Sequence, residues 1–186
     1  MPKNKRRKND AYFTLPALTK ALMDRVKFSG SIFECCAGDG AIANLLKAQY
    51  PHVYTNDIDK SFDCDDFVDA TREDSWKTWE YANWCNSVVT NPPFSQAHLI
   101  LPLAYKYAKF QVAMLLRLTY LEPCENRAEW LEAYPPNRVM VFGQPRPSFS
   151  GNGKHDSCTT AWMVWDKTSP NSFKWDFVYK WNKNDE

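Results

Sequence analysis

The chain has 186 residues, of which 44% are hydrophobic and 24% are charged, and its formal net charge is +1 at pH 7. This balance is typical of a globular protein and excludes wholesale disorder. No apolar run approaches the ~20 residues of a membrane-spanning helix, and no apolar signal-peptide core follows the N-terminus. The six cysteines form no CxxC pair and no zinc-ligand spacing with histidine. We therefore expect reduced thiols, a cytoplasmic location and no metal site.

Charge is unevenly distributed along the chain. Five cations lie in the first eight residues, namely Lys3, Lys5, Arg6, Arg7 and Lys8. We expect residues 1–10 to form a basic flexible arm, since nothing in them anchors to a core. Residues 11–186 are expected to form a single domain with no separate target-recognition domain. The arm is a solubilising tail, a phosphate-binding segment or a nuclear address. For the phosphate-binding alternative, the candidate contacts are Lys5, Arg6 and Arg7.

The rest of the chain alternates helical and strand-like segments. Apolar spacing and breaker residues predict helices over 15–26, 41–50, 95–109 and 125–134, and a short helix that carries Trp76 and Trp79. Strands are expected over 31–35, 53–57, 66–70, 87–90, 111–116, 138–142 and 159–165. Such alternation favours a parallel sheet covered by helices on both faces. Ligands of such sheets bind beyond the carboxyl ends of the strands.

Every second residue over 173–181, near the C-terminus, is aromatic, and the residues between them are Lys174, Asp176, Val178 and Lys180. A period of two places the rings on one face of a strand. Because large aromatic side chains are mostly buried, we expect an added edge strand whose aromatic face packs on the core. A base-stacking platform is the alternative.

A glycine loop follows the first predicted strand and opens a helix. Residues 38–43 match the pattern G-x-G-x-x-A, in which the glycines let the backbone approach a ligand closely. Asp57 lies 19 residues after Gly38, at the end of the second strand, where a ribose-binding carboxylate belongs. An ordinary strand–turn–helix with a tight glycine turn remains the alternative.

The acidic residues of this loop favour one cofactor. Glu34 and Asp39 repel the pyrophosphate of a nicotinamide dinucleotide. S-adenosylmethionine has no phosphate, and its ammonium and sulfonium groups are attracted by carboxylates. The loop therefore predicts S-adenosylmethionine.

Residues 91–94, Asn-Pro-Pro-Phe, follow the fourth predicted strand. An exocyclic amine on an aromatic ring is a poor nucleophile, because its lone pair is delocalised. The Asn91 side-chain oxygen and the Pro92 carbonyl can each accept one N–H bond and draw that nitrogen toward a tetrahedral form. Pro92 and Pro93 stiffen the turn, and Phe94 offers a face on which a base stacks. The motif predicts methyl transfer to such an amine without a metal.

With these motifs, the sequence resembles the S-adenosylmethionine-dependent amino-methyltransferases that carry an Asn/Asp-Pro-Pro-aromatic motif. It is most similar to the small, phage-type DNA adenine N6-methyltransferases, from Tyr12 to about Trp165. The resemblance implies a Rossmann-like class I methyltransferase fold, an α/β architecture. Its sheet is mostly parallel and seven-stranded, with helices on both faces and an antiparallel late strand. It also implies S-adenosylmethionine as cofactor, DNA as partner and adenine N6 as acceptor. For a phage-encoded protein, the location is the host-cell cytoplasm.

The resemblance also implies site residues. Tyr12 and Thr14 belong to the segment that contacts the methionine carboxylate of the cofactor. Ile58 packs on its adenine, and Asp69 reads the adenine amine, with Asp66 as a competing choice. The full implied cofactor set is Tyr12, Thr14, Glu34, Ala37, Gly38, Gly40, Asp57, Ile58, Asp69 and Asn91.

Base choice rests on few residues. Arg117, Arg146 and Lys154 are the candidate nucleic-acid contacts of the body of the chain, and Arg117 is equally suited to a salt bridge. Without a recognition domain, we expect a short recognition sequence or almost none. RNA adenine N6, a protein glutamine N5 amide, and a binding module that has lost catalysis are the alternatives.

Overall fold

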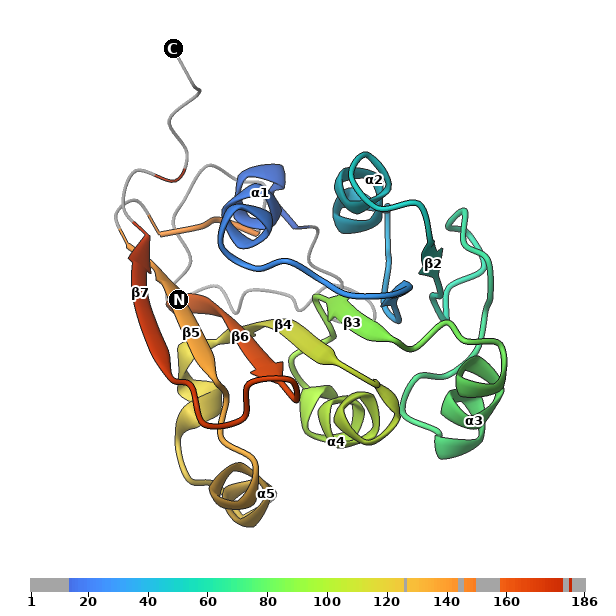
Figure 1. The fold of residues 1–186 in the computed structure, drawn as a ribbon. Helices are drawn as coiled ribbons and strands as arrows, with labels where there is room; N and C mark the ends of the chain where they lie inside the picture. Colours follow the sequence, from blue (N-terminus) through green and yellow to red (C-terminus); the bar gives the residue numbers. More distant parts are fainter. Residues whose placement is uncertain (1–13, 126, 144–145, 150–157, 179–180, 182–186) are drawn as a thin grey trace, which may run out of the picture.

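The computed structural model describes residues 14–125, 127–143, 146–149, 158–178 and 181. One sheet lies between two layers of helices (Figure 1). The helices are α1 (Pro16–Arg25), α2 (Ala41–Lys47), α3 (Glu73–Tyr81), α4 (Ala97–Tyr107), the 3₁₀ turn η2 (Leu118–Leu121) and α5 (Ala128–Ala133). The strands are β1 (Ile32–Glu34), β2 (Val53–Thr55), β3 (Ser87–Thr90), β4 (Gln111–Arg117), β5 (Arg138–Phe142), β6 (Thr160–Asp166) and β7 (Lys174–Val178).

The sheet has seven strands in the order β2-β1-β3-β4-β6-β5-β7. The first four strands are parallel, β6 is antiparallel to β4 and to β5, and β7 is parallel to β5. The predicted α/β Rossmann-like architecture, with its antiparallel late strand, is therefore confirmed. All four of these parallel strands end at one edge of the sheet, which is where ligands of such folds bind.

The predicted strand over 66–70 is absent, and only an isolated bridge joins Asn56 to Asp66. The side chains of this segment compete with a strand ladder for the backbone. Asp66 Oδ1 accepts the N–H of Phe67, and Asp69 Oδ1 accepts the N–H of Thr71. Such local bonds favour turns over strands. The seventh strand of the sheet is β7 instead.

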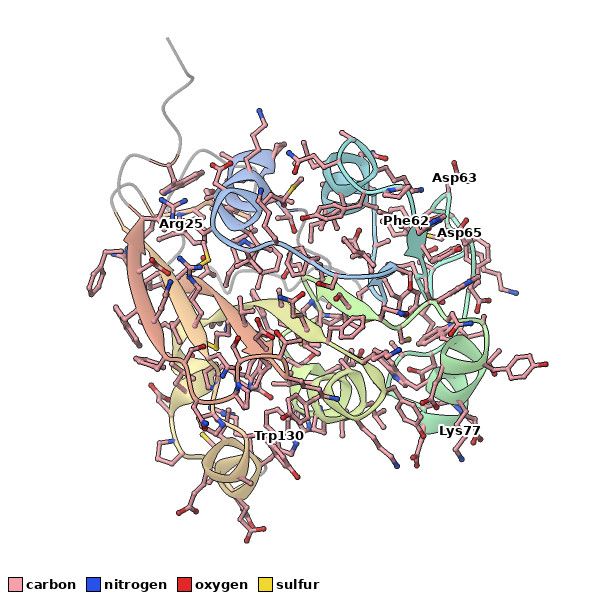
Figure 2. All side chains as sticks on the ribbon, in the orientation of Figure 1. Arg25, Phe62, Asp63, Asp65, Lys77 and Trp130 are labelled. Atoms are coloured by element: carbon pink, nitrogen blue, oxygen red, sulfur yellow. The ribbon has the colours of Figure 1, made fainter. Side chains whose placement is uncertain are left out.

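The two helix layers enclose two apolar clusters. One lies between the sheet and α1 and α2, and its largest buried side chains include Leu18, Leu22, Ile42, Leu46 and Trp162. The other lies between the sheet and α3 and α4, where Phe33 packs against Trp76 and Trp79 at centroid distances of 6.1 and 4.5 Å. Trp130 of α5 adds its ring to this second layer, 5.9 Å from that of Trp165 (Figure 2).

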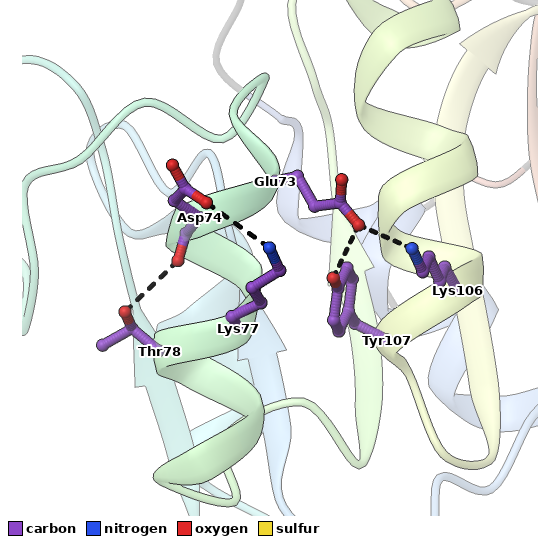
Figure 3. A network of polar contacts seen from close by, with 6 residues as sticks. All are labelled: Glu73, Asp74, Lys77, Thr78, Lys106 and Tyr107. Atoms are coloured by element: carbon purple, nitrogen blue, oxygen red, sulfur yellow. Dashed lines mark hydrogen bonds and ion pairs between the residues drawn. The ribbon is translucent and has the colours of Figure 1, made fainter.

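Polar contacts join α3 to α4 at the surface of the second layer. Glu73 Oε1 accepts hydrogen bonds from Lys106 Nζ and from Tyr107 Oη, the second at 2.8 Å (Figure 3). These bonds hold the pKa of Glu73 below its ordinary value. The contact fixes the start of α3 beside the end of α4, although exposed ion pairs add little to stability.

The predicted C-terminal edge strand forms, but the prediction that its aromatic face packs on the core is wrong for three of its rings. Phe173, Trp175 and Phe177 are 64%, 42% and 65% exposed. Beyond the strand, Trp181 does pack against the first apolar cluster, with its ring 6.1 Å from that of Phe142. The opposite face of β7 is the one that packs, because Val178 enters the first apolar cluster and Asp176 pairs with Arg138. Among the described residues, no helix is both long and apolar enough to cross a membrane.

Trp162 fixes α1 to the sheet, because its buried Nε1 donates to the Leu18 carbonyl at 2.9 Å. Trp162→Phe removes this bond and part of the ring volume. We expect the free energy of unfolding to fall by about 1–3 kcal/mol in a denaturant titration. Tyr81→Phe, on the exposed surface of α3, is the control and should change it by less than about 0.5 kcal/mol. Equal losses in the two variants would contradict this role.

Candidate active site

A cleft that is partly open to solvent lies at the carboxyl ends of β1, β2 and β3. Segments that are far apart in the sequence meet there: the glycine loop, the turn after β2, the segment 68–71 and the motif after β3. The lining residues are Thr14, Glu34, Cys35, Cys36, Ala37, Gly38, Asp39, Ala41, Ile42, Asp57, Ile58, Asp59, Phe62, Val68, Asp69, Ala70, Thr71, Asn91, Pro92, Pro93, Gln96 and Ile100.

The glycine loop needs its glycines. Gly38 and Gly40 have φ values of 54° and 77°, in the left-handed region that other residues rarely adopt. The Gly40 N–H closes the turn on the Ala37 carbonyl at 2.9 Å, and Gly40 then precedes the first residue of α2. Gly38 lines the cleft, whereas Gly40 does not and instead shapes the turn.

Asp57 clamps the loop to the end of β2. Its Oδ2 accepts the Gly38 N–H at 2.8 Å, and its Oδ1 accepts the Asp59 N–H at 2.9 Å. The position at the strand end was predicted, but this clamp was not. Beside it, the buried amide of Asn56 bonds to Cys35 O and to both backbone groups of Val68. The role of Asn56 was not predicted, because it depends on which segments become neighbours.

Glu34 is the one carboxylate of the cleft that is fully enclosed, with 1% of its surface exposed. It accepts a hydrogen bond from the backbone N–H of Ala43, at the start of α2. Its Oε2 has no hydrogen-bond partner among the described residues. Burial raises the pKa of Glu34 well above 4.5, and the charges of Asp39 and Asp57 raise it further. A cationic ligand in the cleft would reverse this shift.

The structure separates the two competing aspartates. Asp69 lines the cleft and is held by its bonds to the N–H and hydroxyl of Thr71, at 2.9 and 2.7 Å. Asp66 does not line it, because its Oδ2 accepts a hydrogen bond from Trp79 Nε1 at 2.8 Å. Ile58 lines the cleft with 58% of its surface exposed.

Asn91 stands where β3 ends. Its Nδ2 donates to Thr14 Oγ1 at 3.1 Å, and Thr14 is buried directly before α1. This bond fixes the orientation of the Asn91 amide: Nδ2 faces Thr14, and the acceptor Oδ1 lies on the opposite side of the amide group. Pro92 and Pro93 line the cleft beside it. The predicted cofactor loop and the predicted catalytic motif therefore share one cleft.

Phe94 lies outside the lining of the cleft, and Arg117 covers its ring. The Arg117 guanidinium carbon is 4.8 Å from the ring centroid. Arg117 ends β4, the neighbour of β3, so the two side chains meet at the carboxyl edge of the sheet. Of the two roles expected for Arg117, the described residues show no salt bridge. Its contact is the aromatic ring.

The remaining predicted site residues lie away from the cleft or outside the described residues. Arg146 is half-buried and does not line the cleft. Tyr12, Lys5, Arg6, Arg7 and Lys154 lie outside the described residues. Conversely, Phe62 and Gln96 line the cleft without having been predicted. Figure 2 shows Phe62 in the loop beside β2, together with Asp63 and Asp65. No motif marks this loop, since its approach to the cleft depends on its path.

The vicinal cysteines of the loop also line the cleft. The Sγ atoms of Cys35 and Cys36 are 4.0 Å apart. The hydrogen bond with Cys35, together with burial, raises the pKa of Cys36 well above 9. Cys36 therefore stays a protonated thiol and is a poor nucleophile at neutral pH.

No family model matches the chain, and no curated protein matches it. Solved structures do share its fold. A chain from Vibrio vulnificus, described as a modification subunit of a type I restriction enzyme, is 11% identical, with a TM-score of 0.60. That match covers 95% of this chain and 50% of the other, so this chain spans half the length of that subunit.

Two further structures match over most of both chains. One is an S-adenosylmethionine-dependent methyltransferase from Anabaena variabilis, with 15% identity, a TM-score of 0.52 and coverage of 81% and 84%. The other is described as a hemolysin from Lactococcus lactis, with 11% identity, a TM-score of 0.56 and coverage of 92% and 95%. At such identities the likeness concerns the fold. This fold is that of the class I methyltransferases.

Glu34 makes stability depend on pH in a defined direction. Its pKa is raised in the folded protein, so between the unfolded and folded values the folded state holds a proton that the unfolded chain has lost. The free energy of unfolding therefore falls as pH rises through this window. We expect Glu34→Gln to raise the melting temperature near neutral pH, with the difference vanishing at acidic pH where Glu34 is protonated in both states.

Thermal unfolding across a pH series checks this. Glu129→Gln, on exposed α5, is the control and should leave the pH profile unchanged. A Glu34→Gln variant that is less stable than the wild type at neutral pH would contradict the account.

Proposed function

We propose that this protein transfers a methyl group from S-adenosylmethionine to the exocyclic N6 amine of adenine in DNA. The observation that carries the proposal is one shared cleft. A buried carboxylate with an unpaired oxygen, Glu34, lies in the same cleft as an amide whose orientation is fixed, Asn91. The first suits a cationic cofactor, and the second suits an amine that must be made nucleophilic.

The residues of the cleft fit S-adenosylmethionine. Glu34 offers an acceptor to its cationic amino-acid end, and Asp57 stands where a ribose hydroxyl is expected. Ile58 offers apolar surface and Asp69 an acceptor to the adenine ring and its amine. Tyr12 and Thr14 are the proposed contacts of its carboxylate. When bound, the cofactor supplies an electrophilic methyl group on sulfonium.

The protein's own contribution is to prepare the acceptor nitrogen. Asn91 Oδ1 and the Pro92 carbonyl each accept one N–H of the amine and hold it near a tetrahedral geometry. These acceptors are set before the reaction by the bond to Thr14 and by the stiffness of Pro92 and Pro93. Such preorganisation is an effective form of transition-state stabilisation. Phe94, which lies just outside the cleft lining with Arg117 over its ring, is the proposed stacking surface for the planar acceptor.

Three features support nucleic acid as the acceptor. The aromatic ring that ends the motif, Phe94, suits a base, whereas a glutamine side chain has no ring to stack. Arg117 adds a cation at that ring, and Arg146, Lys154 and the basic arm are further proposed phosphate contacts. The Vibrio chain that shares the fold is described as a restriction-enzyme modification subunit. We further propose that the recognition sequence is short.

Asn91→Ala tests the proposal. The protein is incubated with S-adenosylmethionine and either DNA or RNA, and the digested nucleosides are measured by mass spectrometry. We expect N6-methyladenine in DNA, and a loss of roughly 100- to 1,000-fold or more in the variant, because the amine loses a preorganised acceptor. Cofactor binding, measured by calorimetry, should survive. Undiminished turnover would refute the catalytic role, and methylation confined to RNA would refute the acceptor.

Asp57 has two roles that two substitutions separate. Asp57→Ala removes the proposed ribose acceptor and the clamp on Gly38, and should weaken cofactor affinity about tenfold to a hundredfold. Asp57→Asn keeps an oxygen that can accept the Gly38 N–H, so we expect a smaller loss. Calorimetric titration measures both. An unchanged dissociation constant in the Asp57→Ala variant would assign the ribose to another acid, such as Asp59.

A further inference from the structure

β7 is an edge strand, and the aromatic rings on one of its faces are not covered by any other described part of the chain. β7 is the last strand of the sheet, and its outer side has no strand beside it among the described residues (Figure 1). Trp175 and Phe177 of β7, and Phe173 directly before it, are exposed. Exposed apolar edge strands tend to pair with other chains, and proteins usually blunt them with charge, bulges or proline.

The backbone of β7 shows which groups point outward. The Lys174 N–H donates to Asn137 O at 2.8 Å, and the Val178 carbonyl accepts the Gly143 N–H at 3.1 Å, so both residues direct their backbone groups toward β5. Backbone direction alternates along a strand. Trp175 and Phe177 therefore direct their N–H and C=O groups toward the open edge. The residues with exposed rings are the ones with outward-facing backbone groups.

We propose that this edge pairs with β7 of a second copy of the chain, antiparallel, about a twofold axis at Trp175. Trp175 then lies opposite Trp175 of the second copy, and Phe173 lies opposite Phe177. On the other face of the strands, Lys174 lies opposite Asp176. Every exposed ring meets a ring and each lysine meets an acid. A twofold interface of this kind is self-complementary and closed.

Charge selects this register over its neighbours. An axis at Lys174 would put two lysines face to face, and an axis at Asp176 would put two aspartates face to face. Directly opposed like charges destabilise a sheet, whereas opposite charges and aromatic pairs stabilise it. The Nε and Nη2 atoms of Arg138 already donate to the Asp176 carboxylate and orient it. Lys174 of the second copy would therefore approach an oriented carboxylate.

The pairing leaves the candidate active site free. β7 is separated from β3 by β4, β6 and β5, so the residues of the cleft do not take part. One continuous sheet would run through both copies, with the catalytic edges facing opposite ways because the two β7 strands are antiparallel. Methyl transfer by each copy is expected to be independent of the pairing, so the dimer and the proposed activity are tested separately.

Sedimentation velocity over a dilution series tests the proposal. We expect the wild type to form a dimer that dissociates on dilution. Phe177→Lys, which replaces a ring pair, and Lys174→Glu, which opposes Asp176, should shift it to monomer. Tyr81→Lys is the control, since Tyr81 is 92% exposed on α3, away from this edge. A wild type that stays monomeric at every concentration overturns the proposal, as does a dimer that both β7 variants leave intact.

Cross-linking tests the register. In a hydrogen-bonded antiparallel pair the Cα atoms are about 5.5 Å apart, within the roughly 4.4–6.8 Å that a disulfide spans. Mild oxidation of Trp175→Cys should give a covalent dimer joined at residue 175, identified by peptide mass spectrometry against the oxidised wild type. Phe177→Cys is the matched control, because residue 177 of one copy would lie about 14 Å from residue 177 of the second copy. A covalent dimer of Phe177→Cys joined at residue 177, with no such link at residue 175 in Trp175→Cys, overturns this register.

Discussion

A buried carboxylate that lacks a second partner is the feature on which the candidate site depends. Glu34 ends β1 inside the core, accepts one backbone N–H from α2, and keeps Oε2 without a partner among the described residues. Isolating a charged group in this way costs stability, which proteins tolerate mainly where a ligand compensates. The raised pKa of Glu34 expresses that cost. A cofactor with a positive charge offsets it, whereas one with a pyrophosphate would add to it.

The rest of the site is built to hold the cleft around that carboxylate. The Asp57 clamp joins β2 to the glycine loop, and the Asn56 amide joins β1 to the segment that carries Asp69. Thr14, placed by α1, sets the amide of Asn91. The buried hydrogen bond between Trp162 and Leu18 fixes α1 to the sheet, and α1 begins two residues after Thr14. The position of Thr14, and with it that of the Asn91 amide, therefore depends on this contact.

The parts of this arrangement that follow from local patterns could be predicted from the sequence. Buried runs such as 87–90 predict strands, and the glycines at 38 and 40 predict a left-handed turn. Side-chain competition was harder to foresee. Residues 66–70 look like a strand, but Asp66 and Asp69 bond to nearby backbone and form turns instead. The contacts of Asn56, Phe62 and Gln96 depend on distant segments meeting, so no spacing reveals them.

The error at β7 has a different cause. Alternation correctly predicts a strand with one aromatic face, but it does not say whether a helix covers that face. α1 and α2 cover the face that holds Val178, and in the described residues no helix lies over Trp175 and Phe177. Burial of aromatic residues is a tendency of whole proteins, and an edge strand has fewer neighbours to supply it. Only the packing of the whole chain shows that these rings are exposed.

If Glu34 faces a cationic cofactor, cofactor binding should change the number of protons that the protein holds, and this number can be measured. S-adenosylmethionine is titrated calorimetrically into the wild type and into Glu34→Gln, in buffers of different ionisation enthalpy at the same pH. A cation beside Glu34 lowers its raised pKa, so binding to the wild type should release protons to the buffer, and binding to the variant should be weaker and release fewer. Tight binding with equal proton release in both proteins would contradict the account.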